Sequence, residues 1–284
     1  MLPEQVVAGL RCRGLRAAIC KRSKSAIGFV LTPLAGNTDS IRFMINYEGI
    51  TRMNNQVYYQ REHIEVVQGA FIRRVYNWMG LGLATTAIVA MFTASSPAML
   101  QLIFGTPMVF FGLILAELGL VMALSAAMDR MQASTAALMF FIYSALNGVT
   151  LSAIFLAYTH ASIANTFFVT AGTFAAMSIY GYTTKKDLTS FGSFLFMGLV
   201  GVVLASVVNF FLNSPAIYWL ITYAGIIVFV GLTAYDTQAI KQIASQGFGD
   251  QESEKKGAVI GALRLYLDFI NLFLMLLRLF GRRR

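Results

Sequence analysis

The chain has 284 residues, of which 57% are hydrophobic and only 12% are charged, and its mean hydropathy is +0.66. A soluble domain carries about twice that fraction of charged residues, so the composition excludes an ordinary soluble protein and indicates a polytopic membrane protein. The apolar runs are long and uninterrupted, whereas a β-barrel would show short alternating segments. We therefore predict an all-α bundle, and a chain of this length holds about seven spans.

The net charge of +9 does not indicate a nucleic-acid partner, because of where the charge lies. Residues 1–52 carry eight Lys and Arg and three acidic residues, a net charge of +5. Most of the remainder falls in loops that flank the apolar segments, where basic residues report membrane topology. We therefore expect the lipid bilayer as a partner and no nucleic acid.

The basic segment 1–52 has three interpretations. Residues 10–24 are rich in Arg and nearly free of acids, as in a mitochondrial transit peptide. The segment is also typical of a disordered tail drawn to anionic lipid headgroups. We favour a third interpretation, an over-extended start before a true start at Met53, because Glu48 and Gly49 require purine-rich codons where a bacterial ribosome-binding site would lie. Residues 53–76 then form a cytoplasmic N-terminal segment.

Long intervals without charge mark the predicted spans. Between Arg74 and Asp129, for example, the only charge is Glu117. Each such interval is long enough for two spans and contains a polar or turn-forming break, at 95–97, 159–162 and 213–215. The pattern predicts a transmembrane domain over 77–280 with helices at 77–94, 107–128, 134–156, 163–182, 191–212, 216–237 and 258–280.

Basic residues predict which ends of these spans face the cytoplasm. The three breaks contain no Lys or Arg, whereas the alternate loops contain Arg130, Lys185, Lys186 and Lys241. The positive-inside rule then makes the N-terminus cytoplasmic and turns the breaks outward. Seven spans put the basic C-terminus, residues 281–284, outside, against the same rule. Either the last helix is a central one whose insertion its neighbours dictate, or it is re-entrant. We favour a full span because the segment is long enough to cross.

Two aspartates on neighbouring spans are the candidate functional residues. Asp268 lies inside the apolar segment 258–280, and Asp236 lies at the end of the preceding one. A carboxylate at membrane depth costs a few kcal/mol or more, so it usually faces a cavity and serves a function. If the two carboxyls meet, a shared proton is the stable arrangement near neutrality. Losing that proton would separate the helices or invite Ca²⁺, so the pair is a candidate gate and a candidate calcium site.

Four other charged residues are candidate partners inside the membrane. Arg264 lies one helical turn before Asp268 and is a candidate counter-ion; in that case the aspartates have a purely structural role. Arg130 most simply marks topology, but it is a second candidate counter-ion. Glu117 and Arg278 lie at similar depth in the outer half of the bundle, and we predict a structural ion pair between them.

The sequence contains no catalytic pattern that we can identify. Two membrane aspartates raise the hypothesis of an intramembrane aspartyl protease, but neither Asp236 nor Asp268 stands in the Gly-x-Gly-Asp context of such enzymes. There is also no His-Glu-x-x-His zinc motif. We therefore predict a protein that is not an enzyme and has no cofactor, with calcium entering only as a transported ion.

Residues 181–188 (GYTTKKDL), 229–238 (FVGLTAYDTQ) and 265–273 (LYLDFINLF) resemble the Bax inhibitor-1 family. More narrowly, they are similar to its bacterial inner-membrane branch, the YccA-like proteins. The resemblance extends over about residues 65–281. It implies a seven-helix fold in the bacterial inner membrane, with the C-terminal helix at the centre of the bundle.

The resemblance also implies a function. Members of the family are associated with a pH-sensitive Ca²⁺ leak gated by an aspartate pair, and the matching positions here are Asp236 and Asp268. An arginine at the inner end of the second span accompanies that pair, and Arg130 is the nearest candidate. The alternative is a non-conducting regulator that binds a membrane protease or another membrane partner during stress.

Overall fold

The computed structural model describes the backbone of residues 47–127 and 130–284, and the side chains of residues 68–127 and 130–284. Most of the segment 1–52 lies outside the described residues, so its three interpretations stay predictions. All that follows concerns the compact unit Arg52–Arg284. The helices of the described part are α1 (Tyr47–Ser95), α2 (Pro97–Phe104), α3 (Pro107–Ala126), α4 (Ala133–Leu151), α5 (Ala153–Ala157), α6 (His160–Thr183), α7 (Thr189–Leu212), α8 (Pro215–Gln246) and α9 (Gln251–Phe280).

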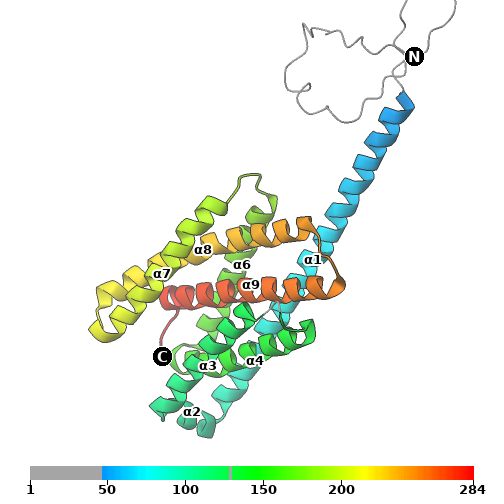
Figure 1. Ribbon diagram of the computed structural model, residues 1–284. Helices are drawn as coiled ribbons and strands as arrows, with labels where there is room; N and C mark the ends of the chain where they lie inside the picture. The colour runs from blue at the N-terminus through cyan, green and yellow to red at the C-terminus, as the bar shows by residue number, and fades with distance from the viewer. Residues whose placement is uncertain (1–46, 128–129) are drawn as a thin grey trace, which may run out of the picture. The chain divides into compact units, whose positions relative to one another are not determined.

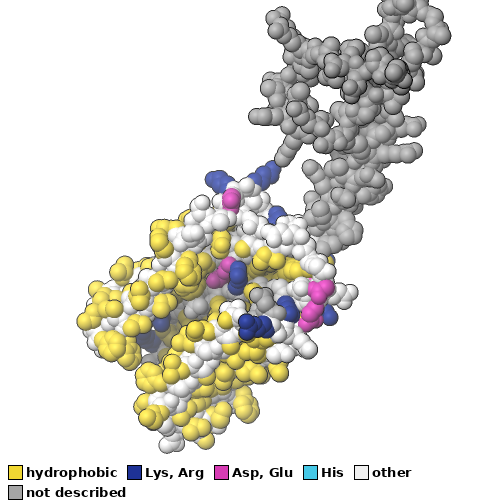
Figure 2. All heavy atoms as spheres, viewed as in Figure 1, with side chains coloured by type: hydrophobic (Ala, Val, Ile, Leu, Met, Phe, Trp, Pro, Cys, Tyr) yellow, Lys and Arg dark blue, Asp and Glu magenta, His cyan; other side chains and the backbone are white. Residues whose placement is uncertain are grey.

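Seven helical segments of the described part are long and apolar enough to cross a membrane. The first begins at Gln68 within α1, and α4 and α5 together form the third, Ala133–Ala157. The other five coincide with α3, α6, α7, α8 and α9. This confirms the predicted all-α polytopic class and the predicted number of spans. Hydrophobic side chains cover much of the surface of these helices, as expected for surfaces that face lipid (Figure 2).

Local sequence signals set several helix ends. Pro97, Pro107 and Pro215 each occupy the first turn of a helix, where the missing N–H costs nothing. At the start of α9 the Asp250 carboxylate accepts a hydrogen bond from the Ser253 backbone N–H at 2.9 Å. α8 is followed at once by Gly247, whose φ of +75° suits glycine. The turn between α8 and α9 is therefore short, and the two helices run antiparallel (Figure 1).

The last helix lies at the centre of the bundle, as predicted. In the most apolar stretch of α9, 72% is buried inside the bundle. The corresponding share in the other spans is 6% to 39%. α9 packs against α4, α6 and α8 (Figure 1). It also contacts α1, where the Tyr266 and Thr86 hydroxyls form a hydrogen bond of 2.7 Å. A helix that is apolar over most of its circumference is stable in this central position because most of its surface meets other helices.

The boundaries predicted for the last two spans were wrong. We expected the sixth span to end near 237 and the seventh to begin near 258. In the structure α8 continues to Gln246 and α9 already begins at Gln251. The polar residues between them belong to amphipathic turns: Ile240 and Ala244 are buried one helical turn apart, while Lys241 and Gln242 are more exposed. Asp236 consequently lies well inside α8 and not at its end.

Other elements also differ from the sequence-based prediction. The first break does end a helix, but it is followed by the eight-residue helix α2 inside the predicted loop. The third span is interrupted at Ser152, between α4 and α5. The domain limits expected at 52/53 and 76/77 both fall inside the continuous helix α1.

The C-terminal arginines lie beside the break that joins α5 to α6. The Thr159 N–H donates to the Arg282 carbonyl at 3.2 Å, and the Arg284 N–H donates to the Ala157 carbonyl at 3.1 Å. The Arg282 N–H donates to the Ser162 hydroxyl at 2.8 Å. α9 is thus a continuous helix that ends at the level of a charge-free break, in agreement with a full span. The side of the membrane that this end faces stays a prediction.

Candidate functional site

α8 and α9 bring Asp236 and Asp268 together inside the bundle. The two carboxyl groups are close enough to form a hydrogen bond when one of them carries a proton. Asp268 is only 4% exposed, and the Asp236 side chain is 14% exposed. The structure therefore joins the two residues that the sequence singled out.

One oxygen of this pair has no partner. Asp268 Oδ2 is buried and makes no hydrogen bond with the described residues. A buried charged oxygen in that position is costly, and a second carboxylate beside it adds repulsion. A single proton between the two carboxyls relieves both costs, because one group then donates and the other accepts. The arrangement is chemically suited to holding and releasing a proton.

Arg264 faces the pair, but not in the way that the sequence predicted. Its Nη1 lies 3.9 Å from Asp236 Oδ1 on the neighbouring helix, so Arg264 pairs with Asp236 and not with Asp268. The Arg264 side chain is 49% exposed. A long contact from a half-exposed guanidinium is a weak ion pair, so Arg264 moderates the charge of Asp236 without neutralising the buried Asp268.

The structure does not support Arg130 as a counter-ion to the aspartates. Arg130 is exposed in the turn after α3. Among the described residues, the cation in contact with the pair is Arg264. The reason is one of packing: α3 lies against α4, while the aspartates lie between α8 and α9.

The predicted ion pair between Glu117 and Arg278 was also wrong. Glu117 on α3 accepts hydrogen bonds from the Thr150 hydroxyl and, at 3.5 Å, from the Asn147 amide, both on α4. Arg278 on α9 lies over the ring of Tyr218, 5.5 Å from its centroid. The two side chains leave their helices toward different neighbours, so a similar depth along the spans does not bring them together. Neutral hydroxyl and amide donors satisfy the carboxylate instead.

Sequence reasoning missed Gln238, which connects α8 to the α6–α7 loop. Its side-chain carbonyl accepts from the Leu188 N–H, and its amide donates to the Lys186 carbonyl, both at 2.8 Å. Gln238 is 7% exposed. A glutamine two residues after Asp236, at the polar end of an apolar run, was the available signal. Its partners are fifty residues away, so the sequence alone did not name them.

A bundle of seven apolar spans with a carboxyl pair between its last two helices defines a polytopic membrane protein with an ionisable core. The family model described as "Inhibitor of apoptosis-promoting Bax1" matches residues 68–284. The chain belongs to this family, the Bax inhibitor-1 family, which confirms the resemblance found in the sequence.

Bacterial relatives cover most of the same region. The chain is 55% identical to the inner membrane protein YbhL of Escherichia coli over 215 residues, 75% of this chain and 92% of YbhL. It is 46% identical to a protein of Borreliella burgdorferi over 219 residues, 77% of this chain and 94% of the relative. A protein of Rickettsia prowazekii is 44% identical over 216 residues, 75% of this chain and 90% of the relative.

Proposed function

We propose that the protein is a pH-sensitive Ca²⁺ leak channel of the bacterial inner membrane, gated by the Asp236–Asp268 pair. The observation that carries the proposal is the buried Oδ2 of Asp268, which has no hydrogen-bond partner among the described residues and lies beside a second carboxyl. Membership of the Bax inhibitor-1 family supports the same function. In the closed state one proton is shared between the two carboxyls, and the loss of that proton opens the channel.

Electrostatics supplies the driving force for opening. Two unit charges about 4 Å apart repel each other by about 4 kcal/mol at an effective dielectric constant of about 20. This repulsion acts directly across the contact between α8 and α9, so deprotonation either separates the helices or is relieved by a cation. The two carboxyls offer fewer oxygens than the roughly six to eight that Ca²⁺ takes. An ion at this site would therefore keep part of its water, as suits an ion in passage.

Flux measurement tests the proposal. Ca²⁺ entry into liposomes that contain the purified full chain is expected to rise as the pH increases through the titration of the pair. Liposomes without protein give the background. Glu117→Gln is a matched control, because it neutralises another intramembrane acid whose partners are Thr150 and Asn147. Flux at the background level at every pH would contradict the proposal. A partner that co-purifies with a silent protein would then favour the non-conducting regulator.

Arg264→Gln is expected to move the pH midpoint of this flux to a more alkaline value. The guanidinium lies 3.9 Å from Asp236 Oδ1 and favours the ionised pair, so without it the shared proton leaves at higher pH. Because Arg264 is half exposed, we expect a shift of about one pH unit, at the low end for a neighbouring opposite charge. Arg264→Lys, which keeps the charge, is the control and is expected to restore most of the parent midpoint. An acid shift in Arg264→Gln would contradict the assigned role.

A further inference from the structure

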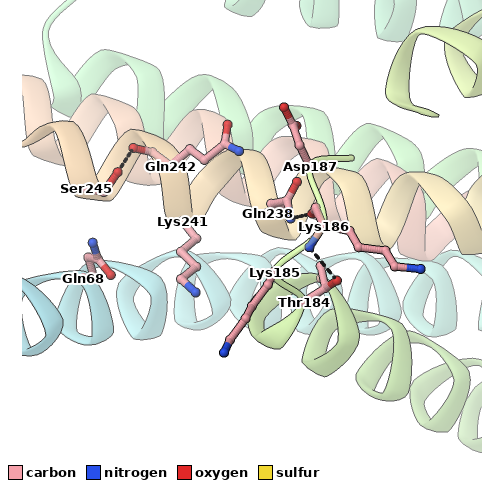
Figure 3. A pocket seen from close by; sticks show the side chains of 10 residues that line it. Gln68, Thr184, Lys185, Lys186, Asp187, Gln238, Lys241, Gln242 and Ser245 are labelled. Carbon is pink, nitrogen blue, oxygen red and sulfur yellow. Dashed lines mark hydrogen bonds between the residues drawn. The ribbon is translucent and has the colours of Figure 1, made fainter. Parts of the chain in front are cut away.

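A polar cavity separate from the aspartate pair lies where α6 ends. Its volume is about 380 Å³, and α1, α6, α8 and the loop between α6 and α7 contribute to its lining (Figure 3). Three lysines and one aspartate line it, a formal net charge of +2. The neutral lining side chains Gln68, Thr184 and Gln242 add hydroxyl and amide donors. A cavity with this composition suits an anion that accepts several hydrogen bonds.

The charged side chains of this cavity point in different directions. In Figure 3 the ammonium groups of Lys185 and Lys241 extend to the same side, whereas Lys186 extends away from them and Asp187 projects on the opposite side. The Lys241 ammonium donates to the Tyr182 carbonyl at 2.7 Å and lies 4.6 Å from the centroid of the Tyr182 ring. An ammonium has three donors, so two remain for a ligand. Lys185 and Lys241 are therefore the pair of cations that a bound anion would meet.

Asp187 offsets one of the three positive charges, but its carboxylate points away from Lys185 and Lys241 (Figure 3). Its carboxylate accepts from both the backbone N–H and the hydroxyl of Thr189, at 2.9 and 2.6 Å. These two hydrogen bonds lower the pKa of Asp187 below its usual value, so it stays ionised. The negative charge is thereby held beside the N-terminus of α7, whose helix dipole stabilises it.

The lining is held in place before any ligand arrives. Gln238 bonds the loop at Lys186 and Leu188 to α8, as described above. At Gly181 the backbones of α6 and α8 are so close that a Cβ would lie 2.2 Å from the Ala234 carbonyl oxygen. Lys185 and Lys241, which come from different elements, therefore keep their spacing. A preformed site loses less conformational entropy when it binds.

The position of the cavity in the fold favours one class of anion. α6 ends at Thr183 and α7 begins at Thr189, so the cavity lies at the end of two spans, at the depth where lipid headgroups are found. Apolar side chains are exposed on the same helices within about a turn of it: Ile179 and Tyr182 on α6 and Ile243 on α8. A ligand with a charged headgroup and acyl chains can contact both surfaces: the headgroup binds in the basic cavity, and the acyl chains pack on these exposed apolar residues.

We propose that this cavity binds the phosphodiester headgroup of an anionic phospholipid, with Lys185 and Lys241 contacting the phosphate oxygens. Basic pockets between transmembrane helices are suited to such headgroups. The proposal does not depend on ion conduction and stands or falls separately from the gating model.

Native mass spectrometry of the purified full chain, titrated with phosphatidylglycerol or with phosphatidylcholine, tests the site. The parent is expected to retain phosphatidylglycerol preferentially. Each lysine near an anionic headgroup contributes about a factor of five in affinity, so Lys185→Ala should weaken binding about fivefold and the double variant Lys185→Ala/Lys241→Ala about 25-fold. The single variant keeps the test valid if loss of the Lys241–Tyr182 contact unfolds the double variant.

Lys186→Ala is the charge-matched control. It removes one positive charge from the same loop but keeps the backbone carbonyl that Gln238 holds. Because the Lys186 ammonium extends away from Lys185 and Lys241 (Figure 3), binding is expected to fall less than in Lys185→Ala. Equal loss in Lys186→Ala and Lys185→Ala, or equal retention of the two lipids by the parent, would overturn the proposal. Inorganic phosphate is titrated in parallel. If it binds as tightly as phosphatidylglycerol and needs the same lysines, the site takes free phosphate and the lipid assignment is wrong.

Discussion

Asp268→Asn is expected to abolish the pH dependence of Ca²⁺ flux and to leave the channel closed. The Asn amide has nearly the shape of a protonated carboxyl, carries no charge and donates a hydrogen bond to the Asp236 carboxylate. The variant therefore resembles the pair that has kept its proton at every pH. Asp236→Asn should behave in the same way, because the two carboxyls act as one unit.

The size of the effect follows from the repulsion that the substitution removes. If even 1.4 kcal/mol of that repulsion drives opening, its loss lowers the open population about tenfold. We therefore expect alkaline flux to fall by about tenfold or more. Asp268→Asn should also fold at least as stably as the parent, because it replaces a buried ionisable group with a neutral amide.

Two measurements decide the outcome for the aspartate variants. The first is liposome flux from acid to alkaline pH, in which Glu117→Gln and the exposed Asp187→Asn should keep the profile of the parent. The second is thermal unfolding of each purified variant, which separates a closed channel from a misfolded one. If both aspartate variants keep the pH dependence of the parent, the shared-proton gate is wrong.

Gly181→Ala is expected to destabilise the fold strongly. The added Cβ would lie 2.2 Å from the Ala234 carbonyl oxygen of α8, and it would also approach the Ala234 Cα. Both are backbone atoms, so the clash is not relieved by a side-chain rotation and α6 has to move away from α8. Overpacking of this kind costs about 1–3 kcal/mol and occasionally more, and we expect the upper end of that range.

Gly172→Ala is the matched control for this prediction, because it lies on the same helix and a Cβ there meets nothing within 4 Å. It should be neutral, or more stable by up to about 1 kcal/mol from helix propensity. Thermal unfolding and gel filtration in detergent compare the two variants. Equal unfolding temperatures would show that α6 and α8 are not held in close contact. Because Ala234 is two residues from Asp236, the same displacement should also disturb the gate.

The sequence predicted the spans well because hydropathy is a local property. A run without charges between charged loops is apolar wherever it folds, and the seven spans follow from that alone. The same reasoning failed for residues 238–257, where α8 and α9 continue as amphipathic turns. There only one face of the helix is buried, around Ile240. The segment is polar on average, so its hydropathy does not reveal that it is helical.

The candidate site was predictable in part. Asp236 and Asp268 stood out because charge is costly in an apolar segment, and their meeting follows once α8 and α9 are antiparallel neighbours. The partners of the other charges did not follow. Arg264 contacts Asp236 across the helix pair, and Glu117 is satisfied by Thr150 and not by an arginine. Depth along a span was predictable, but the direction in which a side chain leaves its helix was not.

The sequence by itself determined the class, the number of spans, the family and the two aspartates, since each depends on composition or on a short motif. Only the tertiary structure decided that Asp268 has an unpartnered buried oxygen, that Gln238 holds the α6–α7 loop, and that Lys185 and Lys241 share a cavity. These features depend on how helices rotate about their axes and how closely they approach. Rotation and approach are set by packing between residues far apart in the chain, which no local pattern encodes.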